Sequence, residues 1–189
     1  MPNELILDSL RRRMRAMHSL YEDATATMSA EQVNHQEREG TLPIAFSLFH
    51  FTNMEDKLGA MLKGEAPIFN EDWSQRIAPK IPDHGRGRSV EEMQFQRIGN
   101  YEAFIDYMKA VFERTDKWLA QLPLAELNRV MIERPLPPNV VKSYSARVAG
   151  DVGITVLDAI ECWIYHHGLR HMGEIELSRS FVGLSGMTS

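Results

Sequence analysis

Hydrophobic residues recur three and four positions apart along four long stretches of the chain. This spacing places them on one face of an α-helix, with polar residues on the other face. The pattern predicts four amphipathic helices, at about residues 3–28, 42–63, 89–122 and 155–184. In the first of them the hydrophobic positions are Ile6, Leu10, Met14, Met17 and Tyr21. Four helices that each bury one face favour an all-α fold, a four-helix bundle.

Short sequence patterns mark where these helices begin and end. Three pairs of residues have the spacing of a capping box, in which two side chains bond each other's backbone N–H groups at a helix start. They are Ser29 with Gln32, Ser89 with Glu92, and Thr155 with Asp158. The first pair predicts a short helical turn, and the other two predict the starts of the third and fourth long helices. Gly64 and Pro123 suit the ends of the second and third helices.

The connections between the helices predict two further features. Residues 64–88 lack helical periodicity and are rich in proline and glycine, which predicts a long crossover that lets the third helix run parallel to the second. Residues 123–154 contain two short segments, LNRVMIER and KSYSARVAG, around the sequence LPPNV. We expect a short β-hairpin there, between helices three and four. Residues 1–189 are predicted to form a single domain.

Histidines occupy positions on two of these helices where the pattern calls for core side chains. His167 and His171 continue the face begun by Val156 and Ile160, and His50 lies on the hydrophobic face of the second helix. Two histidines four residues apart can direct ring nitrogens at one point, as metal-binding pairs do. Such pairs also arise by chance, and the alternative is that they are buried core histidines with hydrogen-bond partners. The third histidine favours one shared explanation, which is a metal site.

The chemistry of such a site follows from its ligands. Three neutral imidazoles leave a divalent ion with its full charge and an open coordination position, as in catalytic zinc sites. Such an ion lowers the pKa of bound water to around 7, or holds a thiol as the thiolate. Imidazole ligands suit zinc, nickel and iron alike, so the sequence leaves the identity of the metal open.

Two other residues of the fourth helix bear on this site. Glu174, three residues after His171, is predicted to orient a histidine or to accept a proton in catalysis, and the alternative is a surface carboxylate. Cys162 precedes His167 by five residues, about 140° around an α-helix, so we expect it to face away from the metal. It is the only cysteine, so a thiol that takes part in a reaction has to come from a cofactor.

The charge of the chain narrows the classes of partner. The 189 residues carry a formal net charge of −5, which argues against a nucleic-acid surface because such a surface needs clustered positive charge. No segment resembles a signal peptide, and no apolar run approaches the length of a membrane span. We therefore expect a cytoplasmic protein that acts on a small molecule and binds neither nucleic acid nor a membrane.

Three segments of the chain resemble the DinB/YfiT-like superfamily. They are FHFTNMED around His50, HHGLRHMGEI around His167 and His171, and the C-terminal SRSFVGLSG. Members of this superfamily are four-helix bundles with a long crossover and are commonly homodimers. The resemblance implies a divalent metal on the three histidines, with Gly173 and Glu174 completing the motif. One departure is Met172, which stands where many members carry arginine.

The resemblance also suggests what the metal does. In characterised members it supports transfer or isomerisation with a low-molecular-weight thiol, such as bacillithiol, mycothiol or glutathione. We therefore expect a metal-dependent enzyme that activates such a thiol for transfer to an electrophilic small molecule. The alternatives are a metal-dependent hydrolase and a non-catalytic, stress-related binding module with a structural metal. An open coordination position and a roomy pocket would favour an enzyme over a binding module.

Overall fold

Four long helical segments form the body of the protein. The computed structural model describes residues 2–85 and 87–187. The long segments are α1 (Pro2–Ala26), α3 (Ile44–Lys63), α6 (Tyr101–Gln121) and a continuous run of α8 (Val156–Ala159), η2 (Ile160–Tyr165) and α9 (His166–Phe181). The predicted all-α four-helix bundle is therefore confirmed.

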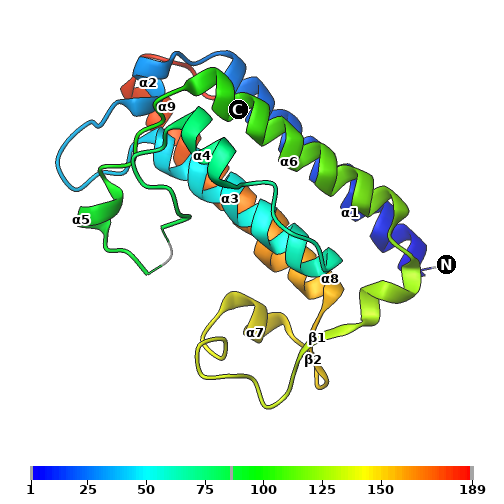
Figure 1. Cartoon of the computed structure of the whole chain (residues 1–189). Coiled ribbons are helices and arrows are strands. Elements are labelled where there is room, and N and C mark those ends of the chain that lie inside the picture. The colour runs from blue at the N-terminus through cyan, green and yellow to red at the C-terminus, as the bar shows by residue number, and fades with distance from the viewer. Residues whose placement is uncertain (1, 86, 188–189) are drawn as a thin grey trace.

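The four segments form a ring of neighbours. α1 packs against α6 and α9, and α3 packs against the same two helices. α3 and α6 run in the same direction, so the connection between them crosses back along the bundle (Figure 1). The predicted crossover is therefore present, and it places α3 beside α9, where the histidines lie.

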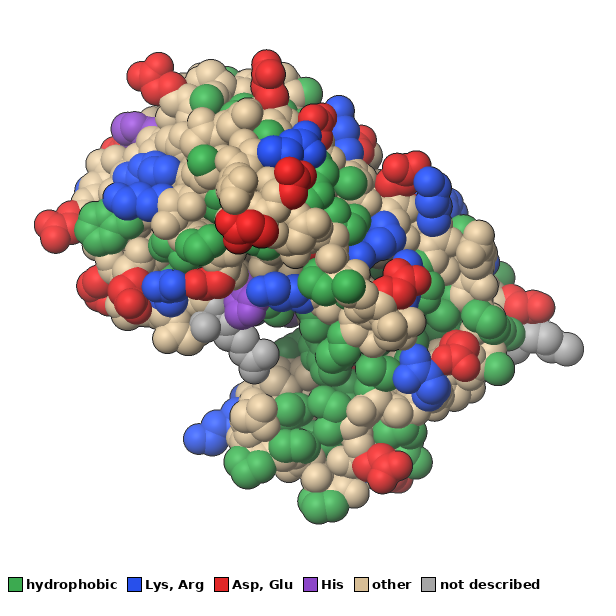
Figure 2. Space-filling view, in the orientation of Figure 1, with side chains coloured by type: hydrophobic (Ala, Val, Ile, Leu, Met, Phe, Trp, Pro, Cys, Tyr) green, Lys and Arg blue, Asp and Glu red, His purple; other side chains and the backbone are tan. Residues whose placement is uncertain are grey.

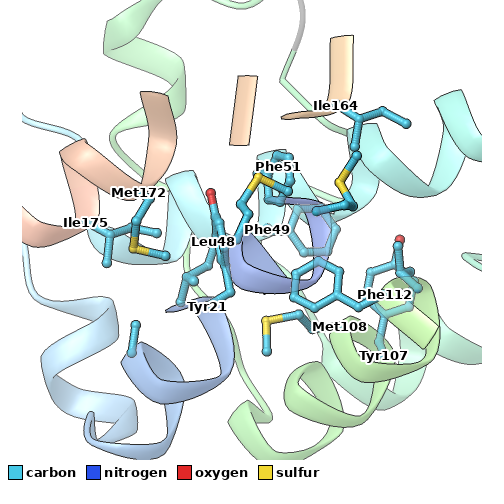
Figure 3. Packing of buried hydrophobic residues seen from close by; sticks show 14 of the residues in the cluster. Tyr21, Leu48, Phe49, Phe51, Tyr107, Met108, Phe112, Ile164, Met172 and Ile175 are labelled. Atoms are coloured by element: carbon cyan, nitrogen blue, oxygen red, sulfur yellow. The ribbon is translucent and has the colours of Figure 1, made fainter. Parts of the chain in front are cut away.

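Aromatic and sulfur-containing side chains fill the centre of the bundle (Figure 3). Residues among the largest fully buried are Tyr21, Phe49, Phe51, Tyr107 and Phe112. The buried face of α1 differs from the prediction near its start, where Ile6 is 40% exposed and Leu7 is buried instead. No helix within the described ranges has both the length and the apolar character needed to cross a membrane.

All three capping boxes are present, but one begins a shorter helix than predicted. Ser29 opens α2 (Ala30–Asn34) and Thr155 opens α8. Ser89 opens only α5 (Val90–Met93). The third long helix begins at Tyr101, after a new N-cap residue, Asn100. The prediction of one helix over 89–122 was therefore wrong at its start.

Long-range hydrogen bonds explain why the chain leaves the helix between α5 and α6. The Gln96 amide bonds both the N–H and the C=O of Ile81, at 2.8 Å each. Asn34 bonds both backbone groups of Ile98, at 2.8 and 2.9 Å. Within this segment, the Arg97 carbonyl also accepts the Lys80 N–H at 2.9 Å. These backbone groups are satisfied without a helix, so the segment is stable in an extended form.

The crossover contains a helix that the sequence pattern did not predict. α4 (Glu71–Ile77) is capped by Asn70 and packs against α6. The preceding turn is held by Asp56 of α3, whose carboxylate accepts the N–H groups of Ile68 and Phe69 at 2.8 and 2.7 Å. The helix is only seven residues long, so its periodicity is too short to detect.

The segment between α6 and α8 forms a small antiparallel sheet at one end of the bundle (Figure 1). After η1 (Leu124–Asn128), β1 (Val130–Glu133) pairs with β2 (Gly153–Thr155), with Ile132 opposite Ile154. The antiparallel pair is as predicted, but the second strand is not: part of KSYSARVAG forms α7 (Tyr144–Val148) instead. The pairing requires glycine at 153, because φ is +126° there and a Cβ would lie 2.1 Å from the Ile132 carbonyl oxygen.

Candidate metal centre

The three predicted ligands meet where α3 packs against α9. His50 comes from α3, and His167 and His171 lie one turn apart on α9. One ring nitrogen from each can be chosen so that all lie within 4.8 Å of one another. The Nε2 atom of His167 is 3.2 Å from Nε2 of His50 and 2.9 Å from Nε2 of His171. The sequence thus predicts correctly which histidines come together.

A glycine between the two histidines allows this close packing. A Cβ at Gly168 would lie 2.3 Å from the sulfur of Met17 and 2.6 Å from the ring of Phe51, so any larger residue would push α9 away. The Tyr21 hydroxyl donates a hydrogen bond to the Gly168 carbonyl at 2.8 Å. The hydrophobic pattern does not mark Gly168, although a glycine inside a helix between two candidate ligands is a sign of close approach.

Hydrogen bonds at the far side of two rings fix their orientation. Nδ1 of His50 donates to the His84 carbonyl oxygen, and Nδ1 of His171 donates to the Glu174 carboxylate at 2.6 Å. In a neutral imidazole one nitrogen carries the proton and the other carries a lone pair. The Nε2 lone pairs of His50 and His171 therefore both point toward His167.

A neutral His167 carries one N–H, so its Nε2 can satisfy at most one of the lone pairs of His50 and His171 by a hydrogen bond. A cation between the three nitrogens would satisfy all of them, so the donor set fits a metal ion. Nitrogen–zinc bonds of about 2.0–2.1 Å at tetrahedral angles put ligand nitrogens roughly 3.3 Å apart. The observed separations of 3.2 and 2.9 Å are close to that value. The rings also have the outer hydrogen bonds that usually accompany metal-binding histidines. The cluster is thus compatible with a divalent metal.

Burial keeps the imidazoles of His50 and His167 neutral, as metal ligands must be. It lowers the pKa of His50 to about 4, against the opposing effect of the His84 carbonyl. The pKa of His167 falls to about 3, first because of burial and then because His171, His50 and Arg170 disfavour a further positive charge. Both rings are therefore unprotonated near neutral pH.

Glu174 lies behind His171 as seen from the other two rings. Its carboxylate accepts hydrogen bonds from His171 and from the Ser47 hydroxyl, the latter at 2.9 Å. Burial by itself would raise the pKa of Glu174, but these two hydrogen bonds lower it below its usual value. Glu174 lines a cavity of about 330 Å³ that is separate from the one that His50 and His167 line. This position suits an orienting role for the carboxylate.

A larger cavity, of about 530 Å³, opens beside His50 and His167. One wall comes from α3 and the η2–α9 run, and the other from β1 and the segment that leads into α7. In the space-filling view the molecule is hollowed between its α7 end and the rest of the bundle, with many hydrophobic side chains around the hollow (Figure 2). The site therefore has room for a ligand of small-molecule size.

Cys162 lines this cavity, which corrects the expectation that it faces away from the histidines. The reason is local: residues 160–165 form a π-helix, in which the His166 N–H bonds the Glu161 carbonyl five residues earlier. In a π-helix, residues five apart lie nearly on one face, unlike those of an α-helix. Burial, with help from Asp158 and Glu161, raises the pKa of the Cys162 thiol to about 11, so it stays a neutral thiol.

The crossover takes part in the site through its backbone. The His84 carbonyl orients His50. Asp83 pairs with Arg88 within the same segment, and this ion pair lowers the pKa of the Asp83 carboxyl. A backbone acceptor leaves no trace in sequence patterns, so only the folded chain could reveal it.

Comparison with known proteins gives the family. Residues 13–175 match the DinB superfamily. A solved structure described as a conserved protein from Enterococcus faecalis has the same fold: the TM-score is 0.74 at 16% identity, over 93% of this chain and 96% of that one. No curated protein matches the chain. The four-helix bundle with its crossover, the histidine cluster between α3 and α9, and this match over most of the chain all agree, and the chain belongs to the DinB superfamily.

Proposed function

We propose that this protein is a metal-dependent enzyme. His50, His167 and His171 bind one divalent ion, which is zinc, nickel or iron. The ion activates a low-molecular-weight thiol, which is transferred to an electrophilic small molecule. The observation that carries the proposal is the convergence of neutral imidazole lone pairs at the edge of a cavity of about 530 Å³. A purely structural metal would have no need of such a cavity.

The residues of the chain divide the work between them. The His84 carbonyl and Glu174 hold two imidazoles with Nε2 toward the ion, and Glu174 thus acts as a positioning residue through His171. The bound ion supplies positive charge that favours the thiolate form of a thiol, whose free pKa is near 8.5. Cys162 stays protonated, so the reacting thiol comes from outside the chain.

The test is to incubate metal-loaded protein with bacillithiol, mycothiol or glutathione and a panel of electrophiles. The expected result is thiol conjugation that disappears in His50→Ala and His167→Ala and persists in His35→Ala. His35 is an exposed histidine paired with Glu37, so it controls for the loss of a histidine elsewhere. Turnover of esters or amides without a thiol would contradict the transferase and favour a hydrolase. A metal held by a fourth protein ligand, without turnover, would favour a binding module.

We also propose that the enzyme is a homodimer. The support is a row of residues four apart on α9 that faces outward: Leu169, Gly173, Leu177 and Phe181. Leu177 is 64% exposed and Phe181 is 50% exposed, and exposed apolar rows of this kind are often covered in an assembly. Light scattering should give twice the chain mass of 21.6 kDa, and Leu177→Glu should reduce it to the mass of one chain. A wild-type protein that is monomeric at micromolar concentration would refute this proposal.

A further inference from the structure

The large cavity has a charge character that differs from the rest of the molecule. The chain carries a formal net charge of −5. Among the described residues that line the cavity, however, none is an aspartate or a glutamate. Arg170 is the one arginine among these described lining residues, and none of them is a lysine. A bound divalent ion would add further positive charge, so the cavity favours an anion although the protein as a whole is acidic.

Arg170 is placed to meet a ligand. It lies three residues after His167, hence on the same side of α9, and it is exposed. It forms no hydrogen bond or ion pair with the residues described in the structure, whereas Arg114 and Arg129 are each paired with a carboxylate. Its charge does reach the site, because it contributes to the lowered pKa of His167. The charge of Arg170 also helps to lower the pKa of Glu174, but no direct hydrogen bond or ion pair among the described residues holds its guanidinium. An exposed arginine of this kind at the rim of a cavity is a ready binding group for a carboxylate.

The opposite part of the cavity is apolar. Met54, Leu58 and Met61 of α3 face Ile132 of β1 and Val140 across it. Met61 is 49% exposed, so this side chain has apolar surface available for a ligand. These side chains suit the hydrocarbon part of a molecule and offer nothing to a strongly polar one.

We propose that the cavity binds an amphipathic organic acid, with its carboxylate on Arg170 and its hydrocarbon part between α3 and the β1–α7 segment. This inference rests on the proposed function, since it names the class of its electrophilic substrate. A carboxylate bound to Arg170 would lie beside His167, which is a proposed metal ligand. The part of the substrate next to the carboxylate would therefore lie near the metal. Arg170 is then the residue that selects acids over neutral analogues.

The experiment compares two ligands of almost equal size, 4-phenylbutanoate and 4-phenylbutanamide. Their binding is measured by calorimetry on the full chain as purified and again after zinc is added. Arg170→Gln should weaken binding of the carboxylate about tenfold, the range for a partly exposed charged hydrogen bond, and should change binding of the amide less than twofold. Arg170→Lys should keep most of the affinity for the carboxylate.

A matched control is Arg147→Gln on α7, which changes the net charge equally at an exposed arginine outside the cavity lining. It should leave both affinities unchanged. Equal losses for acid and amide in Arg170→Gln, or no loss at all, would overturn the proposal. The binding result is independent of turnover: a protein that prefers the acid through Arg170 but binds no metal would refute the proposed function, and only the acid-binding site of this inference would stand.

Discussion

The protein buries histidines in two places with opposite surroundings. His18 of α1 lies between Glu55 of α3 and Asp116 of α6, with a nitrogen–oxygen distance of 3.1 Å to each carboxylate. Its ring stacks on Phe112 at 4.1 Å. In the metal centre, by contrast, Nε2 of His50 faces other imidazoles.

The two surroundings produce opposite proton affinities. Burial alone would lower the pKa of His18, but Glu55 and Asp116 outweigh it and raise the pKa to about 9. No carboxylate among the described residues is bonded to His50 or His167, and burial lowers their pKa values to about 4 and 3. Near neutral pH His18 is therefore an imidazolium ion, whereas His50 and His167 are neutral and each keeps a nitrogen lone pair.

The contrast teaches that a buried histidine takes its role from its partners. Carboxylates make His18 a cation that joins three helices, and no metal is needed to balance their charge. Neutral imidazoles at the other cluster leave electron pairs unmatched, and this is what a metal ion would satisfy.

Removing a histidine from each cluster should separate the two roles most clearly. His171→Ala should weaken zinc binding by more than about 100-fold. Loss of a residue that only hydrogen-bonds a metal ligand costs about 10–100-fold, so loss of a ligand itself should cost more. His18→Gln should leave zinc stoichiometry unchanged. Competition titration with a zinc indicator measures both. Similar zinc affinity in wild type and His171→Ala would show that the cluster is not a metal centre.

The free energy of unfolding should depend on His18, although zinc binding does not. His18→Leu leaves Glu55, which is fully buried, without its cation, and the loss of one partner from a buried pair costs about 3–5 kcal/mol. His35→Leu, at the exposed pair with Glu37, should cost at most about 1 kcal/mol. Urea denaturation of the metal-free proteins would measure both. Equal costs would mean that His18 contributes no more than a surface histidine.

The charged state of His18 should make stability depend on pH on the alkaline side. Because its folded pKa of about 9 exceeds the ordinary 6.5, its contribution is complete below pH 6.5 and is lost as the pH rises through 9. At 1.36 kcal/mol per pH unit the difference corresponds to roughly 3 kcal/mol. The unfolding free energy should fall by that order between pH 6 and pH 9.5. In His18→Gln the fall should be much smaller, and an unchanged slope would contradict the assignment.

Glu174→Gln should test whether the carboxylate acts through His171. A glutamine can still accept the hydrogen bond from His171 but carries no charge, so zinc affinity should drop about 10–100-fold, as for other outer partners. Zinc titration of this variant gives the value. The matched control is Glu176→Gln, which alters a neighbouring carboxylate on α9 that bonds the Met187 N–H. An equal change in both variants would indicate a general charge effect.

The smallest effect concerns the bond that ties α1 to the metal-binding helix. Tyr21, three residues after His18, donates its hydroxyl to the Gly168 carbonyl at 2.8 Å. Tyr21→Phe should reduce the unfolding free energy by about 1 kcal/mol. Zinc affinity should stay within a few-fold of wild type, because the ring that packs on Phe51 remains. A large loss of zinc affinity would show instead that this bond positions the histidines.

Much of the fold and of the candidate site follows from local sequence. A helical period of 3.6 residues decides which side chains share a face, so the positions of His50, His167 and His171 among apolar residues already place them in the core. Capping pairs such as Thr155 with Asp158 depend on residues three apart, and all three pairs formed. These features are recoverable because the interactions that determine them are short-range.

Tertiary structure decided the rest, because the interactions concerned join residues far apart in the chain. Asn34 pairs the backbone of Ile98 in an extended segment where a helix was predicted, and the His84 carbonyl sets the proton position on His50. The π-helical turn brought Cys162 to the cavity, and the segment before α7 closed its outer wall. His18 shows the limit most simply: its sequence neighbours give no sign of Glu55 or Asp116, and only the packing of three helices makes it a cation.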